Sequence, residues 1–438
     1  MAGGNNVIAG LGSTGLSYAR YLRSRGESFI VLDQAVSDSR RQALEEIAPG
    51  TVIGNLTIQA ISGADTVYVS PGVPLSHPAL EAAASRGAEL KGDVQMFGEL
   101  ADAPLVVVTG TNGKSTVSEL FAAIAGDQIK NVSLAGNIGT PCLDVLDEEA
   151  ELYVLEASSY QLELACSLRS KVALVLNLSP DHLDRYPDAE SYYATKLAIY
   201  DHCESAVVNR ALNLSLPENL PTATFGTDQV GGTGHFGLVP GGGGYLLVHG
   251  DQPLVHESEI SLSGTHNLTN VLAALATGWL LEFDMDRMIE SVLAFRGLAH
   301  RSEFIAELNG VRYINDSKGT NPGALIAAVR GCADGRNVHL IAGGVSKDAD
   351  FSSLQSEISP YVKTVNLIGE SSEQLQQALP GLETRRCDSL DEAVAAADRV
   401  AEAGDVVLLS PGCASFDQFR HYAERGDKFR ALVAGLSP

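Results

Sequence analysis

The chain contains the stretch VVVTGTNGKST, residues 106–116, in which an apolar β-branched run enters a glycine turn followed by a lysine and two hydroxyl residues. Backbone N–H groups of such a turn and the N-terminus of the next helix together cradle phosphate oxygens. Lys114 can reach the β- and γ-phosphates of a nucleotide, and the Ser115 hydroxyl can ligate magnesium. The usual P-loop pattern, G-x-x-x-x-G-K-[ST], has glycine where this chain has Val108. The stretch is therefore a shortened variant, which we favour over an ordinary strand–turn–helix corner.

Apolar runs separated by helices, on either side of this turn, predict a parallel sheet that is covered on both faces. The runs are 105–108, 152–155 and 172–176. Ligands bind beyond the carboxyl ends of such strands. Glu156 directly follows the second run, and His182 follows the third. We expect Glu156 and Ser115 to be magnesium ligands; the alternatives are a helix-start acid at Glu156 and a structural histidine at His182.

The N-terminal segment has a second glycine turn, G-x-G-x-x-G at Gly10, Gly12 and Gly15. A predicted strand at 29–32 ends at Asp33, and another is predicted at 66–69. Strand, glycine turn, helix, strand and acid form the layout of a dinucleotide-binding fold. The segment is long enough for one nucleotide-binding half-fold, and the motif alone supports an NAD cofactor only weakly.

The remaining chain predicts two more structural features. Alternating runs between residues 226 and 263 predict an antiparallel ribbon, with 250–251 as its hairpin turn and the glycines at 241–244 as a flexible surface loop. The apolar run 271–281 is too short to span a bilayer and predicts a buried helix. C-terminal strands are predicted at 312–314, 338–342, 364–368 and 406–409. We expect an α/β protein of three domains: a Rossmann-like half-fold at 1–91, a P-loop ATPase-type domain at 92–297, and a Rossmann-like α/β domain at 298–438.

Composition narrows the class of function. The 438 residues have a formal net charge of −24, which disfavours binding to nucleic acid or to anionic membranes. Six cysteines lie far apart without a Cys-x-x-Cys pair, which argues against a zinc site or a disulfide scaffold. The N-terminus has no signal-peptide pattern. We therefore expect a cytoplasmic enzyme with reduced thiols.

Several ordered motifs resemble the Mur ligases, the amide-forming enzymes of cell-wall peptide assembly. Beyond the loop at 110–116, the matching motifs are 136–139, 156–162, 181–186, 263–270, 300–301, 315–321 and 409–417. The resemblance implies an ATP-dependent ligase that adds D-glutamate to UDP-N-acetylmuramoyl-L-alanine through an acyl phosphate, for peptidoglycan precursors. It also implies two magnesium ions, no membrane insertion and a monomer. The alternatives are a sibling ligase for another amino acid, a folylpolyglutamate-synthase-like ligase, a nucleotide-sensing protein without turnover, and an NAD-dependent oxidoreductase.

The resemblance also assigns roles to individual residues. Those implied in catalysis are Lys114, His182, Lys196 and Lys318, and those implied as magnesium ligands are Ser115, Glu156, His182 and a carbamylated Lys196. The implied ATP contacts are Gly110, Thr111, Asn112, Gly113, Lys114, Ser115, Thr116, Asn267, Asn270, Arg301 and Asp316. Implied contacts to the UDP-linked substrate and to D-glutamate are Ser13, Thr14, Asp33, Ser70, Asn137, His182, Thr320, Lys347, Ser415, Phe416 and Tyr422.

Overall fold

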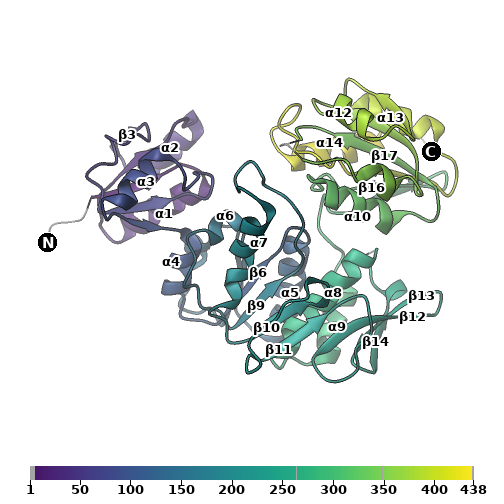
Figure 1. Ribbon diagram of the computed structural model, residues 1–438, viewed down its shortest axis with the longest axis horizontal. Coiled ribbons are helices and arrows are strands. Elements are labelled where there is room, and N and C mark those ends of the chain that lie inside the picture. Colours follow the sequence, from purple (N-terminus) through teal and green to yellow (C-terminus); the bar gives the residue numbers. More distant parts are fainter. Residues whose placement is uncertain (1–4, 263, 347–348, 437–438) are drawn as a thin grey trace.

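The computed structural model describes residues 5–262, 264–346 and 349–436. It has three lobes, each built on its own β-sheet with helices packed against it (Figure 1). The strands are mostly parallel, so the fold is a mixed α/β architecture as the sequence predicts. The lobes follow one another along the chain, from the purple N-terminal lobe to the yellow C-terminal lobe (Figure 1).

The first lobe has a five-stranded parallel sheet in the order β3-β2-β1-β4-β5. Its elements are β1 Asn6–Ala9, α1 Ser13–Ser24, β2 Phe29–Leu32, α2 Asp38–Ile47, β3 Ile53–Gly54, β4 Thr66–Val69, α3 Pro78–Ser85 and β5 Glu89–Lys91. Strands β2 and β4 confirm the strands predicted at 29–32 and 66–69. The third glycine of the motif lets α1 approach the sheet, since a Cβ on Gly15 would lie 2.1 Å from the Gly10 carbonyl oxygen.

The central lobe has a nine-stranded sheet in the order β14-β13-β12-β11-β10-β9-β6-β8-β7. Its strands are β6 Leu105–Thr109, β7 Val132–Gly136, β8 Leu152–Glu156, β9 Val172–Val175, β10 Ala206–Asn209, β11 Thr222–Phe225, β12 His235–Gly241, β13 Gly244–His249 and β14 Gln252–His256. Its helices are α4 Asp93–Leu100, α5 Lys114–Gln128, α6 Ser159–Leu162, α7 Ala189–Leu197, α8 Thr265–Leu280 and α9 Met285–Ala294, with 3₁₀ turns η1 Cys142–Val145, η2 Ala198–Tyr200, η3 Arg210–Leu212 and η4 Glu257–Glu259. Strands β6 to β12 pair in parallel with their neighbours in this order of the sheet, and their buried faces explain the continuous apolar runs.

The predicted ribbon is present as the antiparallel strands β12, β13 and β14, and residues 250–251 form its second turn. One prediction here is wrong: the glycines at 241–244 are not a loop. Gly241 pairs with Gly244, and Gly242 and Gly243 have φ of +65° and +86°. Positive φ at both central residues gives a two-residue turn whose twist matches that of the strands, so the glycines close a hairpin.

The predicted apolar helix is α8, whose residues 270–278 are all buried against α5 and the sheet. Among the described residues, no helix combines the length and apolar character that crossing a membrane requires.

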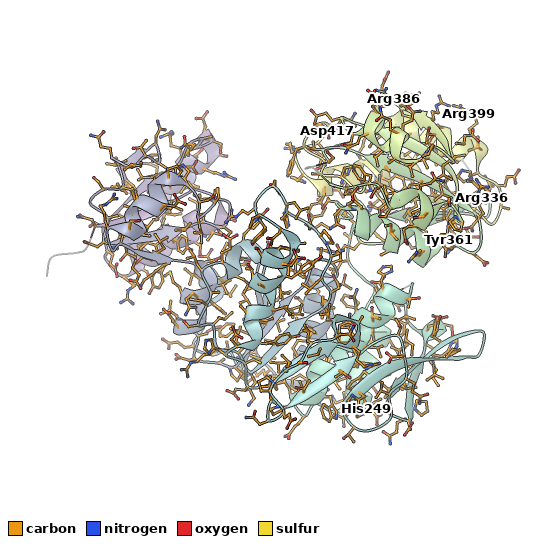
Figure 2. The ribbon with its side chains drawn as sticks, viewed as in Figure 1. His249, Arg336, Tyr361, Arg386, Arg399 and Asp417 are labelled. Atoms are coloured by element: carbon orange, nitrogen blue, oxygen red, sulfur yellow. The ribbon has the colours of Figure 1, made fainter. Side chains whose placement is uncertain are left out.

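The third lobe has a six-stranded sheet in the order β15-β16-β20-β17-β18-β19, antiparallel only between β15 and β16. Its elements are β15 Glu303–Leu308, β16 Val311–Asn315, α10 Pro322–Cys332, β17 Val338–Gly343, α11 Leu354–Ile358, β18 Val362–Ile368, α12 Ser372–Ala378, β19 Glu383–Arg386, α13 Leu390–Val400, β20 Val406–Leu409 and α14 Tyr422–Ala434. The exposed cations Arg336, Arg386 and Arg399 lie on the side of this lobe that faces away from the others (Figure 2). These cations therefore take no part in the site between the lobes.

Candidate active site

A cavity of 850 Å³ lies beyond the carboxyl ends of β6, β8 and β9. Its walls come from all three lobes, through Pro71 of the first, the glycine loop of the second, and α10 of the third. The predicted site residues that line it are Thr111, Asn112, Gly113, Lys114, Ser115, Asn137, Glu156, His182, Lys196, Arg301, Lys318 and Thr320. The topology of the parallel sheet brings these groups together, because strand ends distant in sequence meet at one edge.

The glycine loop at 110–116 has the backbone of a phosphate cradle. Gly110 and Gly113 have φ of +151° and +83°, and α5 begins at Lys114. A Cβ on Gly113 would lie 2.6 Å from the Asn270 side-chain oxygen, so the close packing against α8 also requires glycine. The Lys114 Nζ donates to the carbonyl oxygens of Gly110 and Thr111, each at 2.9 Å. Burial lowers the pKa of Lys114, so the ammonium is held at a cost that an anionic ligand would offset.

Polar neighbours hold the loop in place from the carboxyl end of β9. The Thr111 hydroxyl accepts from the Ser179 N–H at 3.1 Å and from the Tyr192 hydroxyl at 3.2 Å. The Asn112 N–H donates to the Asn177 side chain at 2.9 Å, and the Asn177 amide returns a bond to the Asn112 carbonyl at 3.0 Å. The loop is therefore preorganised by side chains that do not come from its own element.

Glu156 fits a magnesium ligand. Its side chain is 1% exposed; Oε1 accepts from the Asn137 amide at 2.8 Å, and the buried Oε2 has no hydrogen-bond partner in the described part of the chain. A buried carboxylate oxygen without a partner is costly unless a cation or donor binds it. The described residues contain no group of three or more His, Cys, Asp or Glu that could hold a metal alone. Magnesium commonly uses one or two carboxylates plus phosphate oxygens and water, so this donor set suits a nucleotide-bound ion.

Ser115, the second predicted magnesium ligand, is buried at the start of α5, and its hydroxyl accepts a hydrogen bond from the Arg301 guanidinium of the third lobe. Arg301 lies between His300 and Ser302, whose φ angles are +65° and +46°. Left-handed backbone at two non-glycine residues is strained, and such strain persists where surrounding contacts enforce it. The turn therefore presents Arg301 to the phosphate loop.

Lys196 lies inside the central lobe and is 1% exposed. Its Nζ donates to the Gly110 carbonyl at 3.0 Å and lies 4.9 Å from the centre of the Tyr192 ring. Burial, with the nearby Lys114 charge as a lesser cause, holds the pKa of Lys196 well below its ordinary value. A lysine amine without its proton is a nucleophile, so this environment favours the reaction with carbon dioxide that carbamylation requires.

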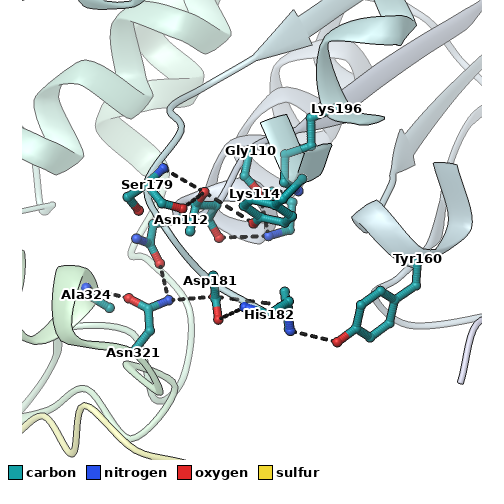
Figure 3. Close-up of polar contacts among 12 residues, drawn as sticks. Gly110, Asn112, Lys114, Tyr160, Ser179, Asp181, His182, Lys196, Asn321 and Ala324 are labelled. Atoms are coloured by element: carbon teal, nitrogen blue, oxygen red, sulfur yellow. Dashed lines mark hydrogen bonds and ion pairs between the residues drawn. The ribbon is translucent and has the colours of Figure 1, made fainter. Parts of the chain in front are cut away.

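His182 is fixed by an aromatic neighbour. Its backbone φ is +55°, and its Nδ1 lies 2.7 Å from the Tyr160 hydroxyl (Figure 3). Burial raises the pKa of Tyr160 to about 12. The other ring nitrogen, Nε2, lies 3.9 Å from the Asp181 carboxylate. Tyr160 therefore determines which histidine nitrogen faces the remaining groups of the site.

In the third lobe, Lys318 and Tyr422 lie together. The Lys318 Nζ is 4.1 Å from the centre of the Tyr422 ring, a cation–π contact at the edge of the cavity. Asp316 lies deeper: its oxygens accept from the Ser302 N–H at 3.1 Å and the Ser410 hydroxyl at 2.7 Å, and burial raises its pKa to about 7. Through its hydrogen bond to Ser302, Asp316 stabilises the turn at 300–302 that carries Arg301.

Other predicted residues lie apart from the described lining of the cavity. Asn267 and Asn270 are buried behind the loop and share a hydrogen bond of 3.3 Å, Ser415 is buried, and Phe416 is 66% exposed. Thr116 is buried in α5. Lys347 lies outside the described residues.

The four residues predicted around the first glycine turn also lie apart from the described lining of the cavity. Ser13 is exposed and Thr14 half-buried. The Ser70 hydroxyl donates to the Gly10 carbonyl at 2.7 Å, and the half-buried Asp33 carboxylate accepts from the Leu11 N–H at 2.6 Å. Ser70 and Asp33 therefore already hold the turn that Ser13 and Thr14 border.

Sequence reasoning gave no role to several polar residues that line the cavity, namely Tyr160, Asp181, Tyr192 and Asn321. One signal was available: Tyr160 follows Glu156 by four positions, at the start of the short helix α6. Asp181 and Asn321 lie within the matched motifs 181–186 and 315–321, which was a second signal. Tyr192 comes from α7, whose approach to the site depends on tertiary packing, so no spacing in the sequence indicates it.

Comparison with known proteins places the whole chain in one family. Residues 4–92 match the Mur ligase MurD-like N-terminal domain, residues 108–278 the Mur ligase middle domain, and residues 300–413 the Mur ligase glutamate ligase domain. The UDP-N-acetylmuramoylalanine--D-glutamate ligase of Marinobacter nauticus is 43% identical over 442 residues, covering 98% of each chain. The protein of the same name from Nitrosococcus oceani is 43% identical over 436 residues, covering 98% of this chain and 96% of its own.

Solved structures agree on the fold. The UDP-N-acetylmuramate-alanine ligase of Thermotoga maritima superposes with a TM-score of 0.64 at 16% identity, covering 99% of each chain. The UDP-N-acetylmuramoylalanyl-D-glutamyl-2,6-diaminopimelate--D-alanyl-D-alanyl ligase of Acinetobacter baumannii gives 0.61 at 15% identity, covering 98% of this chain and 93% of its own. With family domains matched along most of its length and near-full-length relatives above 40% identity, this chain belongs to the Mur ligase family.

Proposed function

We propose that this protein is an ATP-dependent ligase that joins D-glutamate to UDP-N-acetylmuramoyl-L-alanine, with release of ADP and phosphate, in peptidoglycan precursor synthesis. Its relatives of 40–43% identity carry the name of that reaction. The observation that carries the proposal is the cavity in which a glycine loop, the half-buried Lys114, the buried Lys196 and Glu156 meet Lys318 of the third lobe. One Glu156 carboxylate oxygen has no hydrogen-bond partner among the described residues. This set of groups suits a nucleotide triphosphate on one side and a second, acidic substrate on the other.

The first step makes the carboxyl group reactive. A carboxylate oxygen of the L-alanyl group attacks the γ-phosphorus of ATP, the bond from that phosphorus to the β-γ bridging oxygen breaks, and ADP leaves. Negative charge moves onto phosphate oxygens, and Lys114 at the mouth of the loop stabilises it. Glu156 and Ser115, with His182 and a carbamylated Lys196 at a second position, would hold two magnesium ions, which neutralise phosphate charge when bound.

The second step forms the amide. The amine of D-glutamate attacks the acyl carbon, the amine loses a proton, and the bond to phosphate breaks. Lys318 and Thr320 border the cavity on the third-lobe side, where a cation and a hydroxyl suit a carboxylate and a phosphate oxygen. Ser415, Phe416, Tyr422 and Lys347 complete the assignment for the amino acid.

We assign the UDP-linked substrate to the first lobe. Ser13, Thr14, Asp33 and Ser70 lie at or beside its glycine turn. Asn137 and His182 line the cavity, and we assign them to the other end of this substrate. We propose the functional divisions 1–91 for this substrate, 92–297 for ATP and 298–438 for D-glutamate. We also propose a cytoplasmic location, because ATP and nucleotide-linked precursors are small soluble substrates. We propose a monomer, because three lobes of one chain line the cavity.

The test is phosphate release with UDP-N-acetylmuramoyl-L-alanine, ATP and magnesium, assayed against each amino acid and both glutamate enantiomers. We expect that, of all the amino acids tested, only D-glutamate supports phosphate release. Release with L-alanine or another amino acid would instead identify a sibling ligase, and activity on a folate would identify a folylpolyglutamate-synthase-like ligase. ATP binding without release for any amino acid would identify a nucleotide sensor, and NAD reduction an oxidoreductase.

A further inference from the structure

Asn321 of the third lobe makes three polar contacts at the entrance to the ATP site (Figure 3). Its side-chain oxygen accepts from the Ala324 N–H at 2.8 Å and so caps α10. Its side-chain nitrogen donates to the Asn112 side-chain oxygen at 3.2 Å and to the Asp181 carboxylate at 3.1 Å. The amide nitrogen has two hydrogens, so these contacts use the full donor capacity of the group.

Both acceptors belong to the central lobe, on two separate loops of the site. Asn112 is part of the phosphate loop, and the adjacent backbone is fixed by Asn177. Asp181 precedes His182 and accepts from its N–H at 2.8 Å. A single side chain of the third lobe thus contacts the loop that carries Lys114 and the loop that carries His182.

The start of α10 packs directly on these loops. A Cβ built on Gly323 would lie 3.6 Å from the Asn112 side-chain nitrogen and 3.6 Å from the Ser179 hydroxyl. The contact is therefore a packed interface with a hydrogen-bonded centre at Asn321.

We propose that Asn321 is a positioning residue that sets the third lobe in register with the phosphate loop. In the reaction proposed above, on which this inference rests, the amine bound to the third lobe must reach a carboxyl group activated on the central lobe. The effective concentration of the two reactants depends on the geometry between lobes. Asn321 acts through Asn112 and Asp181 and does not itself contact the reacting atoms.

An amide is the group that this position requires. Asparagine, aspartate and serine are equally good helix N-caps, so capping α10 alone does not select among them. Only the amide both caps the helix and donates to two central-lobe groups. Aspartate would put a second carboxylate beside Asp181, and like charges at this distance repel.

The experiment separates the cap from the bridge. Asn321→Ser and Asn321→Asp keep an N-cap, so we expect α10 and the third lobe to stay folded, with an unchanged far-ultraviolet circular dichroism spectrum. Both lose the bridge, so we expect kcat/KM for D-glutamate to fall roughly tenfold to hundredfold, as for lost hydrogen bonds to a charged group, more in Asn321→Asp. The double variant Asn321→Asp with Asp181→Asn reverses donor and acceptor, and we expect it to recover activity relative to Asn321→Asp. The matched control is Ser389→Asp at the N-cap of α13, which should leave kcat/KM unchanged.

A readout without turnover keeps this inference separate from the reaction. Small-angle scattering should give a larger radius of gyration for Asn321→Asp than for the unsubstituted protein, with a return in the double variant. Equal radii in all three proteins, or unchanged kcat/KM in Asn321→Asp, would overturn the positioning role. If the unsubstituted protein releases no phosphate with D-glutamate, the proposed function fails, while the scattering series still decides the role of Asn321.

Discussion

The first and central lobes each contain a strand, a glycine turn and a helix in succession, β1–α1 and β6–α5, yet the leading glycine of each turn has different partners. The Gly10 carbonyl accepts from one neutral group, the Ser70 hydroxyl, at 2.7 Å. The Gly110 carbonyl accepts from two lysine side chains, Lys114 Nζ at 2.9 Å and Lys196 Nζ at 3.0 Å. The first carbonyl is bound by a neutral hydroxyl, whereas the second has two basic groups against one oxygen.

The difference indicates what a glycine turn can and cannot imply. Asp33 accepts from the Leu11 N–H at 2.6 Å, so this N–H of the first turn is hydrogen-bonded within its own lobe. At the second turn the lysines repel each other, which lowers the pKa of Lys196 further beyond the effect of burial. Strand–turn–helix geometry is common to both turns. The second turn also has the Lys114 ammonium at the start of α5 and the basic Lys196 of α7, which suit the triphosphate that we propose it binds.

The sharpest way to break this contrast is Lys114→Ala. If the second turn works by its cation, the variant loses on the order of 3–5 kcal/mol of transition-state stabilisation. Phosphate release at saturating ATP measures the loss. Lys171→Ala is the control, because Lys171 precedes β9 at the opposite edge of the sheet and pairs with Glu204 at 2.7 Å. Near-normal turnover of Lys114→Ala would remove the distinction between the turns.

Glu156→Gln tests the acidic partner of the second turn. The substitution removes a buried charge whose Oε2 has no described partner, so folding stability should be retained or improved. The magnesium concentration for half-maximal activity should rise roughly tenfold to hundredfold, or about 1.5–3 kcal/mol. A magnesium titration of phosphate release gives the value. An unchanged requirement for magnesium would exclude Glu156 as a ligand.

Gly15→Ala tests whether the first turn is mainly a packing device. A Cβ at this position would lie 2.1 Å from the Gly10 carbonyl oxygen, and backbone must move to admit it. We expect a loss of roughly 1–3 kcal/mol in stability, read as a lower thermal unfolding midpoint. Gly12→Ala is the matched control within the motif, because nothing lies within 4 Å of its Cβ. Equal midpoints for the two variants would contradict the packing role.

Sequence periodicity predicted strands in all three sheets, but it did not predict β3, β5, β7, β10, β11, β15 or β19. Buried parallel strands are short apolar runs bounded by turns, and β2, β4 and β20 have the predicted bounds. The prediction for the glycines at 241–244 was wrong for a specific reason: a run of glycine is compatible both with a flexible loop and with a tight hairpin. The pairing of Gly241 with Gly244 decides between them, and it depends on the neighbouring strands.

The candidate site divides along a similar line. Lys114 and Glu156 could be predicted because Glu156 stands at the end of one apolar run and Lys114 follows the glycine turn after another. Asn321 and Tyr160 could not, because their roles depend on which nitrogen or oxygen of another element lies within 3.2 Å. The sequence could place Lys196 on a helix, but its 1% exposure arises from packing against the phosphate loop.

The smallest effect we predict is a pH dependence of folding stability, and it tests the electrostatic difference between the two glycine turns. Because the folded-state pKa of Lys196 lies well below the ordinary lysine value near 10.4, the unfolded chain binds more protons between the two values. The contribution of Lys196 to the free energy of unfolding therefore increases as pH rises through this window and is least favourable below it. In carbonate-free buffer, the stability of Lys196→Met should exceed that of the unsubstituted protein most at low pH, and the gap should narrow towards pH 9.5.

Urea unfolding monitored at several pH values measures that gap, and Lys171→Met, at a solvent-exposed ion pair, should show no comparable pH trend. A gap that stays constant with pH would mean that Lys196 keeps its proton, held by the Gly110 carbonyl and the Tyr192 ring. Added ¹³C-bicarbonate gives an independent reading, because the amine attacks carbon dioxide, a C–N bond forms and a proton leaves. A carbamate resonance that is present in the unsubstituted protein and absent in Lys196→Met would show that Lys196, one of the two basic groups beside the Gly110 carbonyl, has become an anion. The second turn would then pair a cation for phosphate with an anion for magnesium, a combination that the hydroxyl of Ser70 cannot provide in the first.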